Sequence, residues 1–173
     1  MSEQSAGTRE EPWTIRRVLS WTSGHFEKKS IDAPRLTSEI LLAHVLQITR
    51  VKLYVDLDRP LTKDELSTYR ALIARRLNGE PTQYLVGFKE FYGRKFNVDA
   101  RVLIPRPETE LLVEAVLQKL PKDAPCRVLD LCTGSGCIAV TIAAEREQAS
   151  VWAVDLSKDA VAVAKENAEK LGV

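Results

Sequence analysis

The 173-residue sequence lacks the features of a secreted or membrane-spanning protein. No apolar run approaches the roughly 18 residues that are needed to cross a bilayer. Residues 1–11 are polar and small and contain no apolar core of the kind found in a secretory signal. Three cysteines are too few for a disulfide framework in a chain of this size. We therefore expect reduced thiols and a cytoplasmic protein.

An excess of one charge is also missing. The chain has 25 Lys and Arg against 24 Asp and Glu, a formal net charge of +1. Such a balance provides no bulk attraction for nucleic acid or for an anionic membrane, so we expect neither as a direct partner. The spacing of the three cysteines differs from that of a zinc site, and we predict no metal. The oligomeric state is not indicated.

Helical periodicity dominates residues 1–80, and no strand-like alternation appears before residue 84. About four helices are predicted. The first covers 13–28, and the second starts at Ala33–Pro34 with Asp32 as its cap and Leu36 in its apolar stripe. A short third helix follows Thr49, and the fourth runs from a Thr62–Glu65 capping box to Asn78. Residues 1–80 therefore form a helical bundle. Two interpretations of its role, a plain bundle or a substrate-recognition module, remain open.

Residues 81–104 change to aromatic and β-branched side chains punctuated by glycine. Gly93–Arg94 suits a two-residue hairpin turn with glycine first. Because a lone hairpin is only marginally stable in water, it must pack against a neighbouring domain. Two prolines then enforce extended chain before a helix that continues to Leu120. Arg106 and Glu110, at its start, are either a surface ion pair or a wall of an adjacent site.

A strand, a glycine turn and a helix follow in succession. The strand covers 126–131, the turn contains Gly134 and Gly136, and the helix covers 138–144. A second strand, 150–154, ends in Asp155 about 20 residues beyond the turn, where a carboxylate is placed to bind a ribose diol. A last helix covers 158–170, with Ala160, Val161, Ala164, Ala168 and Leu171 predicted to face inward. This arrangement predicts a nucleoside-containing cofactor.

The turn itself distinguishes two classes of cofactor. Asp130 ends the first strand, and Ala139 stands where a third glycine of the dinucleotide pattern would be. A carboxylate beside the turn disfavours a pyrophosphate and suits a cofactor that bears an ammonium and a sulfonium. The residues therefore favour S-adenosylmethionine over NAD, and a nicotinamide-dependent reductase is the weaker alternative.

Three segments resemble a known family. Val128-Leu-Asp-Leu-Cys-Thr-Gly-Ser-Gly is similar to motif I of class I S-adenosylmethionine methyltransferases. Glu90-Phe-Tyr-Gly-Arg-Lys-Phe and Leu103-Ile-Pro-Arg-Pro-Glu-Thr-Glu resemble the release-factor glutamine N5-methyltransferases of the HemK/PrmC type. The string Ile-Pro-Arg-Pro-Glu-Thr-Glu, residues 104–110, is considerably more specific than the glycine turn. The resemblance extends from about Trp13 to Val173.

The resemblance implies an α plus α/β fold. Its parts would be a helical substrate-recognition domain (1–80), a β-hairpin linker (81–104) and the first two βα units of a class I, Rossmann-like methyltransferase domain (105–173). The implied activity is methylation of the glutamine side-chain amide in the Gly-Gly-Gln loop of bacterial class I peptide-chain release factors. By motif match, Thr133, Gly134, Ser135 and Gly136 would line the methionine part of S-adenosylmethionine. Asp130 would lie beneath it, and Asp155 would hold the ribose hydroxyls.

The sequence departs from the family pattern at two points. Cys132 occupies a position where the motif usually has glycine, and we interpret it as a small buried apolar residue in the cofactor-binding set. The family's Asn-Pro-Pro-Tyr motif, which holds the substrate amide, is absent. No catalytic residue is therefore assigned. We expect an amino-terminal fragment that does not methylate alone. A non-catalytic release-factor-binding module and a ribosomal-protein glutamine methyltransferase are the alternatives.

Overall fold

The computed structural model describes residues 12–173, and it divides into two compact units that part between Val86 and Gly87. The first unit is helical, and the second contains two two-stranded sheets with their helices. The predicted division at 80/81 and 104/105 stays a prediction. None of the helices within residues 12–173 is long and apolar enough to cross a membrane.

The helical unit consists of helices whose starts are set by local side-chain caps. The Thr14, Thr49 and Thr62 side chains each accept a hydrogen bond from the backbone N–H three residues on, and Thr62 forms the predicted capping box with Glu65. The helices are α1 (Ile15–Lys28), α2 (Pro34–Leu46), α3 (Arg50–Val55), α4 (Lys63–Leu77) and α5 (Thr82–Val86). Their apolar faces bury a common core that includes Ile15, Phe26, Leu41, Leu42, Leu53, Tyr69 and Ile73.

Two local predictions about α2 are wrong. Asp32 does not cap the helix, because Ala33 occupies the N-cap position in a left-handed conformation with a φ of 46° and no side-chain cap. Asp32 instead uses its backbone carbonyl, which accepts a hydrogen bond from the Thr37 hydroxyl. Leu36, predicted in the apolar stripe, is 40% exposed. Pro34 at the first helical position fixes the start of the helix without a side-chain cap.

The second unit begins with an antiparallel hairpin, β1 (Phe88–Phe91) and β2 (Arg94–Asn97). Its turn is one residue earlier than predicted: Phe91 pairs with Arg94, so Tyr92 and Gly93 are the central residues, with φ values of 49° and 72°. Two positive φ angles are typical of a type I′ turn. The Tyr92 N–H donates to the Glu110 carboxylate at 2.8 Å, so the position of this turn depends on a contact 18 residues away.

The hairpin packs on the helices that follow it, which meets the expectation that it could not stand alone. Phe91 and Phe96 are buried edge to face, with ring centroids 6.0 Å apart. They share a core cluster with α6 (Thr109–Lys119) and α7 (Cys137–Glu145). The remaining buried members of this cluster are Val113, Leu117, Cys137 and Val140.

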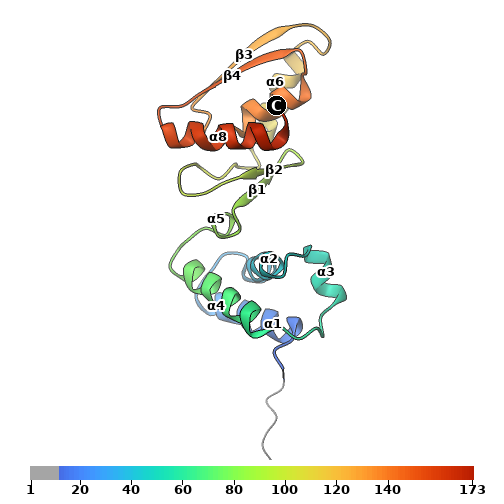
Figure 1. Ribbon diagram of the computed structural model, residues 1–173, viewed down its shortest axis with the longest axis vertical. Coiled ribbons are helices and arrows are strands. Elements are labelled where there is room, and N and C mark those ends of the chain that lie inside the picture. Colours follow the sequence, from blue (N-terminus) through green and yellow to red (C-terminus); the bar gives the residue numbers. More distant parts are fainter. Residues whose placement is uncertain (1–11) are drawn as a thin grey trace, which may run out of the picture. The chain divides into compact units, whose positions relative to one another are not determined.

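Two βα units complete the second unit. Strands β3 (Cys126–Leu131) and β4 (Ala149–Val154) are parallel and in register, with Asp130 opposite Ala153. Helix α8 (Lys158–Leu171) lies between the β3–β4 pair and strand β2 (Figure 1). The helical region, the hairpin and the two βα units confirm the predicted fold class of a partial Rossmann-like methyltransferase domain.

The inward face of α8 differs from the prediction at three positions. Val161 is 40% exposed, and Val163 and Asn167 are fully buried. Within residues 12–173, no element covers the opposite face of the β3–β4 pair. Its exposed apolar side chains are Leu129, Leu131, Trp152 and Val154.

Candidate cofactor site

The glycine loop joins β3 to α7 at the carboxyl end of the sheet, where ligands bind in open α/β sheets. The loop reverses direction through three residues with positive φ: Cys132 at 61°, Gly134 at 56° and Gly136 at 78°. The Thr133 N–H donates to the Val154 carbonyl at 3.0 Å and ties the loop to the end of β4. Both strands thus fix the backbone of the loop.

Asp130 lies beneath the glycine loop. Its side chain is 9% exposed, and its Oδ2 accepts a hydrogen bond from the Thr133 hydroxyl at 2.7 Å. Ser135 and Thr133 are also buried, at 3% and 6% exposure. The buried carboxylate and its hydroxyl partner therefore form the floor of the loop.

Asp155 connects the loop to the residue after β4. Its Oδ2 accepts the Gly134 N–H at 2.9 Å, and its Oδ1 accepts the Ser157 N–H at 3.0 Å. The N–H groups of Ser157 and Gly134 hold the pKa of the Asp155 carboxyl below its ordinary value. The carboxylate is therefore ionised at neutral pH, and each oxygen keeps a lone pair for a further donor.

The two glycines of the loop serve different purposes. A Cβ on Gly136 would lie 3.0 Å from the Ala164 Cβ, so this glycine allows α8 to pack closely on the start of α7. A Cβ on Gly134 would meet no heavy atom within 4 Å. The space beside Gly134 is therefore open to a ligand, while the space beside Gly136 is filled by α8.

The interpretation of Cys132 as a buried apolar residue is wrong. Its side chain is exposed, and its backbone adopts the left-handed conformation. This conformation is the physical reason why glycine suits the position, since any Cβ there meets steric strain. The Cys132 thiol is therefore exposed to solvent rather than packed in the core.

Within residues 12–173, Arg106 and Glu110 form no ion pair with each other, and their place in a site wall stays a prediction. Glu110 accepts the Tyr92 N–H and so holds the hairpin turn, and Arg106 is exposed. The structure thus brings together Asp130, Thr133, Gly134 and Asp155, while Glu110 is committed to the hairpin. The roles of Asp130, Thr133, Gly134 and Asp155 in binding a cofactor stay predictions. Within residues 12–173, no group of three or more His, Cys, Asp or Glu side chains is placed to hold a metal ion.

Asn167 is a site-adjacent residue that the sequence analysis missed. It is fully buried on α8 and donates a hydrogen bond to the Ser135 carbonyl at 2.9 Å. Its spacing from Ala160 and Ala164 places it on the apolar face of the helix. A polar residue in such a stripe is the signal that would have found it, because a buried amide requires hydrogen-bond partners.

Comparison with known proteins agrees with this geometry. Residues 17–87 match the family model described as the PrmC N-terminal domain, and residues 108–173 match the methyltransferase small domain. A parallel strand pair, a glycine loop, an acid near the end of β3 and an acid after β4 are thus the first part of a Rossmann-like methyltransferase domain.

Individual proteins are similar in sequence to nearly the whole of this chain. The chain is 48% identical to the release factor glutamine methyltransferase of Chlorobaculum tepidum, over 95% of this chain and 58% of that protein. It is 47% identical to that of Geobacter sulfurreducens over 94% of this chain and 56% of that protein, and 37% identical to that of Bacillus cereus over 91% and 56%. The chain is thus similar to release factor glutamine methyltransferases along most of its own length, and it spans a little over half the length of these relatives.

Proposed function

We propose that residues 126–173 bind S-adenosylmethionine. We further propose that the reaction in which this chain takes part is methylation of the glutamine amide in the Gly-Gly-Gln loop of class I release factors, in the cytoplasm. The observation that carries the cofactor proposal is the Asp155–Gly134 hydrogen bond. It fixes an ionised carboxylate beside a loop whose glycine faces open space. The substrate part of the proposal is supported by the names of the relatives.

The residues present fit S-adenosylmethionine. The ionised Asp155 matches a ribose diol, which offers two hydroxyl donors. Asp130 places a second carboxyl group beneath the loop, which suits a ligand with cationic groups and disfavours a pyrophosphate. The open space beside Gly134 lets a ligand reach the loop backbone. Asp130 is the carboxyl group that counts against NAD, because a ribose-binding acid such as Asp155 is common to both cofactors.

When bound, S-adenosylmethionine supplies an electrophilic methyl group on a sulfonium. The loop residues would bind it and orient it: Asp155 would hold the ribose, and the backbone of Thr133–Gly136 would hold the methionine part. An amide nitrogen is a poor nucleophile, so transfer depends on the position of the glutamine against the methyl group. This sequence contains no Asn-Pro-Pro-Tyr segment, and no residue of the chain is assigned to that task.

Isothermal titration of the 173-residue chain with S-adenosylmethionine tests the cofactor proposal. Asp155→Asn keeps the side-chain shape but removes the charge, and we expect it to weaken binding about tenfold, as loss of a charged hydrogen bond does. Asp123→Asn, an exposed acid in the loop before β3, is the matched control. Equal affinity of the Asp155 variant and the parent chain, or tighter binding of NADH, contradicts the proposal.

A specific cavity favours a second role, recognition of the release factor by the helical unit. A cavity of about 240 Å³ lies between α1 and α4, and its lining includes Trp13, Trp21, Leu66 and Ile73. Trp21 is 52% exposed and stacks on His25, and the Arg17 guanidinium lies 4.5 Å from the centre of the Trp13 ring. Exposed tryptophan beside arginine is typical of the residues that dominate binding energy at interfaces.

Binding assays with a purified release factor test this second role. We expect Trp21→Ala to weaken capture of the release factor by the chain about tenfold or more, as truncation of an interface anchor does. Val51→Ala on α3, which is 75% exposed and lies outside the cavity, is the control. Equal capture by both variants contradicts the role, and selective capture of a ribosomal protein instead supports the alternative substrate.

A further inference from the structure

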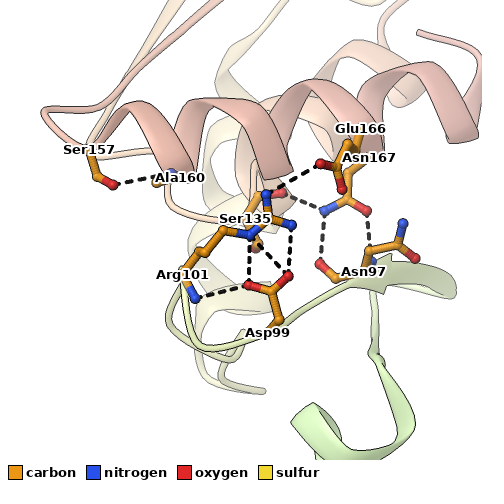
Figure 2. Close-up of polar contacts among 8 residues, drawn as sticks. All are labelled: Asn97, Asp99, Arg101, Ser135, Ser157, Ala160, Glu166 and Asn167. Carbon is orange, nitrogen blue, oxygen red and sulfur yellow. Dashed lines mark hydrogen bonds and ion pairs between the residues drawn. The ribbon is translucent and has the colours of Figure 1, made fainter.

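One buried side chain, Asn167, joins the end of the hairpin to the glycine loop. Its Oδ1 accepts the Asn97 N–H at 2.7 Å, and its Nδ2 donates to the Asn97 carbonyl at 3.0 Å. The same Nδ2 donates to the Ser135 carbonyl at 2.9 Å (Figure 2). The carboxamide thus pairs with both polar groups of one backbone residue and with one carbonyl of the loop, 70 and 32 residues away.

The pattern of donors and acceptors selects asparagine. Asn97 and Ser135 present one N–H and two carbonyl oxygens, and a carboxamide offers one acceptor oxygen and two N–H donors. An aspartate of the same shape retains the acceptor but opposes both carbonyl oxygens. An aliphatic residue would leave buried backbone groups without partners. Apolar packing alone would have been served by a side chain like the neighbouring Val163 or Ala164.

The other contacts between α8 and the segment from Asn97 to Arg101 lie at the surface. Lys170 Nζ donates to Asn97 Oδ1 at 2.6 Å. Arg101 reaches Glu166 at 3.4 Å while it holds Asp99 at 2.7 Å (Figure 2). These groups are partly exposed, and exposed ion pairs contribute little. The buried link between α8, the hairpin and the loop therefore depends on Asn167.

We infer that Asn167 is a positioning residue that fixes the glycine loop for the cofactor and couples the loop to the β-hairpin. By holding the Ser135 carbonyl, it sets the orientation of the peptide unit between Ser135 and Gly136. The inference rests on the proposed function in that the ligand of the loop is S-adenosylmethionine. The hydrogen bond from Asn167 to the loop is present without any ligand.

The test compares the parent chain with Asn167→Asp and with Asn97→Ala. Asn167→Asp removes both donors with little change in volume. Asn97→Ala removes only the surface contact to Lys170, because Asn167 binds the backbone of Asn97 rather than its side chain. Asn167→Ser, a smaller residue with one hydroxyl, is the second variant if the aspartate chain does not fold.

Two readouts are needed. The first is hydrogen exchange of the backbone amides of residues 133–137 and 97 without ligand, compared with the amides of α1 and α4. We expect Asn167→Asp to speed exchange in the loop at least tenfold, with a smaller change at residue 97, whose N–H keeps its acceptor, and with no change in α1 and α4 and none in the Asn97→Ala chain. The second is the affinity for S-adenosylmethionine, which we expect to fall about tenfold in the same variant only.

The outcomes are distinguishable. Unchanged loop exchange in a folded Asn167→Asp or Asn167→Ser chain overturns the inference, as does an equal effect of Asn97→Ala. A uniform rise in exchange throughout the second unit shows a purely structural role and also overturns it. Faster loop exchange in a chain whose parent does not bind S-adenosylmethionine supports the link between Asn167 and the loop while contradicting the proposed function.

Discussion

The backbone N–H of Gly134 donates a 2.9 Å hydrogen bond to Oδ2 of Asp155, 21 residues further along the chain. This bond joins the loop after β3 to the residue that follows β4, and the Ser157 N–H holds the other carboxylate oxygen. The loop and the acid are therefore fixed relative to each other before any ligand arrives. Such preorganisation lowers the conformational cost of binding.

Close packing at Gly136 predicts a large effect of a single methyl group. Gly136→Ala places a Cβ 3.0 Å from the Ala164 Cβ at a φ of 78°, and we expect the free energy of unfolding to fall by about 2–3 kcal/mol. Gly134→Ala, with positive φ but open space, should cost only about 1 kcal/mol. Urea unfolding measures both, and equal losses would contradict the packing role of Gly136.

Strain at Cys132 predicts a stabilising substitution. Its φ of 61° is accessible to glycine without steric cost, so Cys132→Gly should raise the free energy of unfolding by up to about 1 kcal/mol. Cys132→Ala keeps a Cβ in the same conformation and serves as the control. If both substitutions change the urea midpoint equally, the left-handed strain is not the cause.

Exposure predicts the order in which the thiols react. Cys132 is exposed, whereas Cys137 is buried, and burial raises the pKa of the Cys137 thiol. We expect a maleimide at pH 7 to modify Cys132 on the order of tenfold faster than Cys137 or more, as read by peptide mass spectrometry. Saturating S-adenosylmethionine should slow the reaction of Cys132. Modification of both thiols at one rate would contradict the loop geometry.

A buried carboxylate in the helical unit predicts acid sensitivity. Glu39 accepts hydrogen bonds from Tyr54, Arg50 and Arg35. Burial alone would raise its pKa, but these three partners outweigh burial and lower the pKa below its ordinary value. The ionised form therefore stabilises the folded unit above the unfolded pKa of about 4.3, and this stability is lost as the pH falls through the lower folded value.

Glu39→Gln should accordingly lower the free energy of unfolding at pH 7 by about 2 kcal/mol, near the low end for a broken buried ion pair because both arginines are half exposed or more. The same variant should lose less stability than the parent between pH 5 and pH 3. Thermal unfolding followed by circular dichroism measures both effects. Glu27→Gln, an exposed acid on α1, is the control, and parallel pH profiles of the Glu39 variant and the parent would refute the role of the carboxylate.

Features that depend on local chemistry were predictable from the sequence. The Thr62–Glu65 capping box forms as expected, and β3 has its predicted bounds, because a cap or a short apolar run is specified by neighbouring residues. The glycine loop and Asp155 were likewise placed by the order of strand, turn and helix. The family motif then added the expected ligand.

Features that depend on contacts distant in sequence were not predictable. The hairpin turn is fixed by the Glu110 carboxylate on Tyr92, and its position could not be derived from the residues around Gly93. Asn167 was missed because its partners lie 70 and 32 residues away. Cys132 was misplaced because small apolar residues are often buried, whereas backbone geometry exposes this one.

The central claim is that this chain binds S-adenosylmethionine at the loop between β3 and α7. The most direct measurement is a titration of the ¹⁵N-labelled chain with S-adenosylmethionine, followed by amide chemical shifts. We predict that the largest shift changes fall on Thr133–Gly136 and on Asp155–Ser157, and that they disappear in the Asp155→Asn chain at the same ligand concentration. Absence of shift changes at saturating ligand, or changes confined to α1–α4, would contradict the account.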